Sequence, residues 1–273
     1  GFLAGIFLLF LGVLIMRKIF FGVFSLSAIS VFAQENSLFQ EFDNQISIGY
    51  GMQQNTSGFG TSATVPVDSW VYSSSNILNF EGERLFNNGI WVDVNANMEF
   101  GSGPVSINPI VGSNGGTYQS SGYGILGKFG YGFSVANQHF QVIPYGALGL
   151  NNISSSIQYT PSTPDTNPND FAYVAGVGAR LEYRINRTIM LFGDQLLAYN
   201  WDQSGPQDGV QPQNILQLTS VLGAKFNLAE NFQVGVQGTY TNFQPQASNY
   251  TSTGLMMQPQ WSVGGLVSVG LTY

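Results

Sequence analysis

Few residues in this chain carry reactive or charged side chains. Among 273 residues there are eight Lys and Arg, fifteen Asp and Glu, one histidine and no cysteine. Residues at every second position share one face of a β-strand, and charges of mixed sign that are enclosed together form ion pairs. The pattern predicts an enclosed charge network made of Glu81, Glu83, Asp93, Glu99, Lys128, Arg180, Glu182, Arg184 and Lys225.

Catalytic and metal-binding patterns are sparse. The absence of cysteine excludes disulfides and cysteine metal sites. The single histidine, His139, has no acidic residue near it in sequence, and Ser134 is the hydroxyl that would complete a Ser–His pair. No Walker loop, dinucleotide fingerprint or metal-ligand spacing occurs, and the acidic residues show no EF-hand spacing. We therefore expect no catalytic residues, no cofactor and no metal.

The elements that position these residues are predicted to be β-strands. The composition is 44% apolar but only 8% charged, whereas a soluble domain carries about a quarter charged residues. In GIWVDVNANMEF, residues 89–100, the apolar residues from Ile90 to Phe100 alternate with polar ones from Asp93 to Glu99. A period of two with one apolar face is typical of a strand in a soluble β-sandwich, where that face lies in the core, and of a strand in a membrane barrel, where it faces lipid.

Ten such segments follow one another along the chain. They lie near residues 44–53, 76–86, 90–100, 121–133, 139–150, 171–184, 188–200, 214–227, 231–243 and 260–273. Short connections (87–89, 135–138, 185–187, 228–231) alternate with long polar ones (54–75, 101–120, 151–170, 201–213, 244–259). This alternation predicts an all-β protein, an up-and-down antiparallel transmembrane β-barrel, with tight turns on one side of the membrane and exposed loops on the other.

Aromatic residues gather at the two ends of the predicted strands, where amphipathic rings settle at water–lipid interfaces. At the long-loop ends they are Tyr50, Phe100, Tyr123, Tyr173, Tyr199, Tyr240 and Trp261, and at the short-turn ends Phe86, Phe133, Phe140, Tyr183, Phe226, Phe232 and Tyr273.

Residues 1–33 form a hydrophobic leader ahead of the barrel domain at 34–273. Within it, residues 16–33 have the basic start, apolar middle and small-residue exit of a signal peptide, with cleavage expected near Ala33. Residues 1–15 are an apolar upstream extension, and the alternative is a helical anchor that starts in these residues and continues through Arg17 and Lys18. Loss of the leader removes Arg17 and Lys18, leaving six basic and fifteen acidic residues, a net charge of −9. A nucleic-acid partner is therefore not expected.

The final strand, WSVGGLVSVGLTY at 261–273, resembles the C-terminal signature of bacterial outer-membrane β-barrels. The resemblance implies that this strand pairs with the first and that Trp261, Leu271 and Tyr273 are read by the barrel-assembly machinery. VAGVGARLEYRINRTIMLF, residues 174–192, resembles the small OmpA-type and opacity-type barrels. Those relatives usually have eight strands, so eight is the alternative to ten.

This resemblance implies an integral outer-membrane protein in contact with lipid and lipopolysaccharide. We expect a structural or adhesin-like role, with long loops that meet an extracellular ligand or host surface and a largely plugged lumen. A ten-stranded barrel is only slightly wider than one that side chains fill. A narrow porin is the alternative. An outer-membrane enzyme of the omptin type is the most distant one, because His139 lies beside a short turn, away from the extracellular rim.

Overall fold

Ten long strands and one short helix make up most of the described chain. The computed structural model describes residues 37–60, 69–107, 116–135, 139–158, 169–202, 215–245, 256–257 and 260–273, so the predicted leader lies outside them. The elements are α2 (Ser37–Asp43), β1 (Gln45–Gly60), β2 (Ser69–Leu85), β3 (Ile90–Ile107), β4 (Gly116–Tyr131), β5 (Phe133–Val135), β6 (Phe140–Gln158), β7 (Asn169–Arg184), β8 (Ile189–Asp202), β9 (Ile215–Ala229), β10 (Phe232–Pro245), β11 (Met256–Met257) and β12 (Gln260–Thr272).

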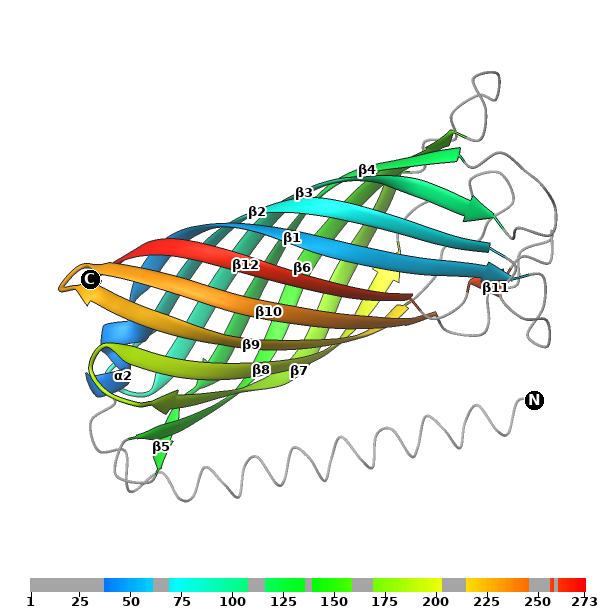
Figure 1. Cartoon of the computed structure of the whole chain (residues 1–273). Helices are drawn as coiled ribbons and strands as arrows, with labels where there is room; N and C mark the ends of the chain where they lie inside the picture. Colours follow the sequence, from blue (N-terminus) through cyan, green and yellow to red (C-terminus); the bar gives the residue numbers. More distant parts are fainter. Residues whose placement is uncertain are drawn as a thin grey trace, which may run out of the picture. The chain divides into compact units, whose positions relative to one another are not determined.

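Sequential antiparallel pairing closes the sheet into a barrel (Figure 1). Each long strand pairs with the next, and β1 pairs with β2 on one side and with β12 on the other. In this last pairing Ile46 lies opposite Leu271 and Thr56 opposite Trp261. The short strands β5 and β11 extend pairings at the rims. The prediction of a ten-stranded up-and-down barrel closed by its first and last strands is confirmed, and the eight-strand alternative is wrong.

The outer face of the barrel is apolar. Leu222 and Leu148, for example, are 73% and 71% exposed. A soluble protein rarely exposes a continuous belt of large apolar side chains to water, so this face contacts lipid. Aromatic residues flank this belt. Exposed rings at the long-loop ends include Tyr50, Phe100, Tyr123, Tyr173 and Tyr240, and at the short-turn ends Phe86, Tyr183, Phe232 and Tyr273. Among the described residues, no helix has the length and hydropathy of a membrane span.

The strands reach further on the long-loop side than the hydrophobic alternation predicts. They have 13 to 19 residues, whereas about 9–11 suffice to cross a bilayer. The predicted strands ended near residues 53, 100 and 150, but β1, β3 and β6 continue to Gly60, Ile107 and Gln158. The predicted bounds of the long connections are wrong because pairing continues where both faces are wet. Outward residues there are polar and exposed: Gln54, Ser74, Ser102, Gln119 and Ser121.

Tight turns join the strands at the opposite end. Gly89, between β2 and β3, has φ of 86°, a left-handed conformation that favours glycine. At the β7–β8 turn, Asn186 Oδ1 accepts hydrogen bonds from the backbone N–H groups of Thr188 and Ile189. The helix α2 and the end of β12 lie at this same short-turn end (Figure 1).

The hydrophobic core lies inside the barrel. Its members are Phe39, Phe42, Leu85, Trp91, Ile143, Tyr145, Ala147, Val174, Met190, Leu196 and Ala198. Glycine makes room for the larger ones. Gly178 lies opposite Tyr145 across the β6–β7 pair, and a Cβ atom at Gly178 would overlap the tyrosine ring. The lumen near the short turns is therefore a packed interior rather than a water-filled pore.

Candidate functional site in the lumen

The helix α2 occupies the short-turn end of the lumen. Its sequence SLFQEFD places Phe39 and Phe42 three positions apart, on one face of a helical turn. Both rings are completely buried in the core. Side chains of the barrel wall hold the helix backbone: Gln233 Nε2 donates to the carbonyl of Phe42 at 3.2 Å, and Asn227 Nδ2 to that of Glu41 at 3.0 Å. We call α2 the plug.

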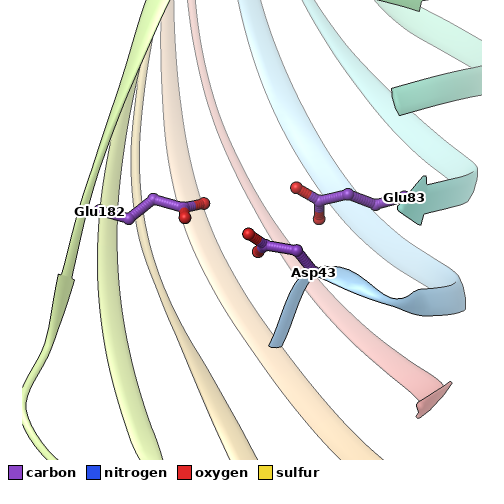
Figure 2. A group of neighbouring side chains, drawn as sticks. All are labelled: Asp43, Glu83 and Glu182. Carbon is purple, nitrogen blue, oxygen red and sulfur yellow. The ribbon is translucent and has the colours of Figure 1, made fainter. Parts of the chain in front are cut away.

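Five charged residues meet beside the plug, and we call them the plug cluster: Asp43, Glu83, Arg180, Glu182 and Lys225. Lys225 Nζ lies 2.5 Å from Glu83 Oε2 and 3.2 Å from Asp43 Oδ1. Arg180 Nε lies 2.5 Å from Glu182 Oε1, and its terminal nitrogen 3.4 Å from Glu83 Oε1. Figure 2 shows the three carboxylates pointing toward one another from α2, β2 and β7. The cluster thus ties the plug to three strands on different sides of the barrel.

A second group, the Lys128 cluster, continues the network across the wall and consists of Asp93, Lys128, Tyr145 and Asp194. Lys128 Nζ contacts Asp194 Oδ2 at 2.8 Å and Asp93 Oδ2 at 3.2 Å, and the Tyr145 hydroxyl donates to Asp194. Trp91 joins the two groups, because its Nε1 donates to Glu83 at 2.8 Å while its ring lies 5.6 Å from that of Tyr145.

The plug cluster is not balanced in charge. Three carboxylates face two bases, and Asp43 Oδ2 and Glu182 Oε2 are buried without a hydrogen-bond partner among the residues that the structure describes. Burial raises the pKa of the Asp43 carboxyl, on α2, well above its usual value of 3.8, and the negative charges of Glu182 and Glu83 raise it further. Lys225 and Arg180 oppose this rise. One oxygen from each of the three carboxylates lies within 4.8 Å of the others, a spacing that a cation can bridge.

The structure places all nine charged residues of the predicted network on the inner face of the barrel, but only six belong to the two clusters. Glu81 is half-buried and lies two residues before Glu83, on the same face of β2. Glu99 lies nearer the long-loop end, where it accepts hydrogen bonds from Ser75 and from Asn55 Nδ2, the latter at 3.0 Å. Arg184 is buried on β7 and belongs to neither cluster.

Three cluster residues and a linking tryptophan were missed by the sequence analysis: Asp43, Tyr145, Asp194 and Trp91. Asp43 was missed because the plug itself was not predicted. The three-residue spacing of Phe39 and Phe42 is the sequence signal that would have indicated a short helix. Asp194 lies on the inner face of β8, which also carries the apolar Met190, Phe192 and Leu196. Polar and apolar residues therefore do not alternate along this strand, and its inner face cannot be recognised from the sequence pattern.

The predicted assembly residues lie along β12 at its seam with β1. Trp261 is opposite Thr56, and Leu271 is opposite Ile46. Tyr273 is exposed, its N–H donates to the carbonyl of Asn44 at 3.1 Å, and its ring lies 5.8 Å from the Arg84 guanidinium.

The single histidine lies at the short-turn end of the barrel. His139 precedes β6 and is exposed, with Nδ1 3.0 Å from the carbonyl oxygen of Arg184. Its position beside the short turn is the one the sequence predicts.

The fold has counterparts among solved structures, although no protein-family model and no curated protein matches the sequence. The transport unit of the autotransporter AIDA-I from Escherichia coli matches with a TM-score of 0.55 and 9% identity over 91% of this chain and 98% of that one. The translocator domain of NalP from Neisseria meningitidis matches with a TM-score of 0.45 and 9% identity over 84% and 88%. The outer membrane protease OmpT from Escherichia coli matches with a TM-score of 0.45 and 8% identity over 85% and 97%.

The likeness to the AIDA-I transport unit shows a shared barrel fold. The chain itself adds an apolar outer belt, aromatic residues at both rims and a polar, charged interior. Closure gives each of the ten long strands in the described part of the chain a partner on both sides, which hydrocarbon demands of any sheet that crosses it. This chain is therefore an integral β-barrel protein of the bacterial outer membrane.

Proposed function

We propose that this barrel is closed to solutes and acts through interactions at its long-loop end. One observation carries the proposal: the plug and the two charge clusters fill the lumen at the short-turn end, where Phe39, Phe42, Glu83 and Glu182 are buried to 1% exposure or less. Ions and water would have to displace an apolar core and paired charges to pass. A rigid closed barrel is a support for surface loops, which carry recognition in many scaffolds.

A narrow channel is the second candidate, favoured by the other half of the lumen. Inward-facing residues nearer the long loops are polar and reached by water: Asn97 is exposed, and Asn95, Glu99 and Gln217 are partly so. Water thus enters from the long-loop side as far as the clusters. Conduction would require the plug to leave its site.

Planar-bilayer recordings on the barrel purified from outer membranes separate the two candidates. We expect wild-type protein, shown to be folded by its heat-modifiable gel mobility, to give no steady conductance. Replacing both plug rings, Phe39→Ala with Phe42→Ala, removes the apolar anchors of α2 and should produce channel openings. The matched control is Glu41→Ala, since Glu41 is exposed on the same helix, and it should remain silent. Long-lived openings from wild-type protein would reject the closed barrel and support the channel.

The charge of the chain narrows the kind of partner that the long-loop end would bind. The basic residues outside the predicted leader are in the lumen or beside short turns: Arg84, Lys128, Arg180, Arg184, Arg187 and Lys225. Three of the five long connections carry acidic residues, and none of the five carries Lys, Arg or His; the acidic residues in or beside them are Asp68, Asp165, Asp170, Asp202 and Asp208. We therefore propose a cationic or uncharged polar partner, because a polyanion would meet only like charge. Contacts with lipopolysaccharide and the assembly machinery stay predictions.

A further inference from the structure

Some carboxylate oxygens of the plug cluster accept hydrogen bonds and others do not. Both oxygens of Glu83 have donors: Oε1 accepts from Trp91 Nε1, and Oε2 from Lys225 and from Gln45 Nε2. Glu182 uses Oε1 for Arg180, and Asp43 uses Oδ1 for Lys225. This leaves Asp43 Oδ2 and Glu182 Oε2, both buried and both without a donor in the described part of the chain.

We propose that Asp43 and Glu182 hold one proton between them in the folded barrel, and that this proton latches the plug into the lumen. Three carboxylates and two bases leave one negative charge in excess, and a buried unpaired charge is strongly disfavoured. One proton removes the excess charge and gives the two carboxyl groups an O–H donor. Like-charged carboxylates that share a buried site commonly resolve their repulsion in this way.

A proton fits this site better than a metal ion. A divalent cation would sit about 2.0–2.6 Å from its oxygen ligands. The same three carboxylates already contact the ammonium of Lys225 and the guanidinium of Arg180. A metal bridging them would lie beside two fixed positive charges and would change the excess from one negative to one positive. A proton balances the cluster with both bases in place.

The charged neighbours of Asp43 come from three strands. Glu83, with Glu81 two residues before it, lies on β2, Arg180 and Glu182 lie on β7, and Lys225 lies on β9. The strand β10 contributes the uncharged Gln233, whose Nε2 donates to the carbonyl of Phe42 on the plug. Because burial and the two neighbouring carboxylates raise the pKa of Asp43 in the folded barrel, its contribution to docking is full below the unfolded pKa and is lost as pH rises through the folded one.

Hydrogen exchange of the full-length barrel tests the latch. Protection factors of the amides of residues 38–44, corrected for the intrinsic exchange rate, should fall as pH rises through the raised pKa of Asp43, well above the usual 3.8, by at most about tenfold per unit for one proton. Asp43→Asn keeps the shape of the side chain and leaves two carboxylates facing two bases. Its profile should be flat, with more protection than wild type at the alkaline end. Infrared difference spectra should show the carbonyl stretch of a protonated acid in wild type and lose it in the variant.

Two further variants, Glu41→Gln and Glu182→Gln, serve as controls. Glu41→Gln, on the exposed side of α2, should retain the wild-type pH profile. If Asp43→Asn does not fold, Glu182→Gln removes the other partner of the pair and should flatten the profile in the same way. A flat wild-type profile, or a slope that survives both variants, would overturn the latch. So would loosening of the plug by a chelator at constant pH, which would point to a metal. These readouts require no channel or surface ligand, so silent bilayers with a flat profile would reject the latch alone.

Discussion

One guanidinium holds two carboxylates together in the middle of the network. Arg180 contacts Glu182 at 2.5 Å and Glu83 at 3.4 Å, and its Cζ lies 4.5 Å from the centre of the Phe192 ring. Planar delocalised charge suits this position better than an ammonium, because it pairs with oxygens at its edge while its face stacks on an aromatic ring. The side chain is 3% exposed, so water cannot take over these contacts if it is lost.

Removing this guanidinium should destabilise the barrel sharply. Arg180→Met keeps the apolar stem but leaves Glu83 and Glu182 buried with one base, Lys225, between three acids. Loss of one partner of a buried pair costs about 3–5 kcal/mol. Denaturant unfolding in micelles, followed by heat-modifiable mobility, measures this loss. Arg187→Met, in the exposed β7–β8 turn, should change the unfolding free energy by less than about 0.5 kcal/mol. Equal stability of the two variants would mean that the network contributes little.

Among the elements, β12 has two tasks: it crosses the membrane and closes the sheet. Tyr273, the residue that follows β12, donates its N–H to the carbonyl of Asn44 just before β1, and its ring lies 5.8 Å from the guanidinium of Arg84 on β2. Arg84 also lies 4.7 Å from the Phe86 ring. This outward arginine lies among aromatic rings at the short-turn rim, a usual position for a side chain whose head group reaches the interface.

A charge in place of the terminal ring should impair assembly. Tyr273→Asp removes an interfacial anchor and the ring contact at the closing seam, so less folded barrel should reach the outer membrane. Membrane fractionation with heat-modifiable mobility gives the folded yield. The control, Tyr183→Asp, alters an exposed aromatic residue in the same belt on β7, away from the seam, and should cost less. Equal yields of the two variants would show that position at the seam does not matter.

How far the sequence predicts an element depends on whether its two faces differ. In β2, β3 and β7 polar residues recur at every second position, so the inward positions of Glu83, Asp93 and Arg180 follow from periodicity, although the apolar Leu85, Trp91 and Val174 also face inward. The strand β8 buries Met190 and Phe192 inside and exposes Leu191 and Leu197 outside, and its inward aspartate was not found. Neither the plug nor the strand ends beyond the membrane can be predicted from the lipid-facing pattern, because lipid contacts neither of them.

At the scale of the whole molecule, charge is sorted along the barrel axis. Ion pairs gather toward the short turns, hydroxyl and amide groups line the other half of the lumen, and the long connections add only acidic charge. The two ends of the barrel, outside the aromatic belts, therefore differ in charge, and each end faces the water on its own side of the membrane. The long-loop surface is the one that distinguishes cationic from anionic partners.

The purified barrel in zwitterionic detergent should bind polylysine and not dextran sulfate. Asp165→Asn combined with Asp170→Asn lowers the negative charge beside one long connection and should weaken polylysine binding severalfold at low salt, where charge attraction is screened least. Glu230→Gln removes an exposed acid from the short β9–β10 turn and should have a smaller effect. Biolayer interferometry gives both affinities. Tight binding of dextran sulfate would contradict the proposed charge of the partner.

The contacts of the plug imply an order of folding. Asp43 meets Lys225 across 182 residues of sequence, and Phe42 meets Gln233 across 191. Bringing such distant segments together before the intervening strands pair would carry a large loop-closure entropy with few contacts to offset it. The pocket for Phe39 and Phe42 exists only once the wall is complete. The helix that precedes β1 in sequence is thus the last part to settle, and every nascent barrel passes through a stage in which its interior is still open at both ends.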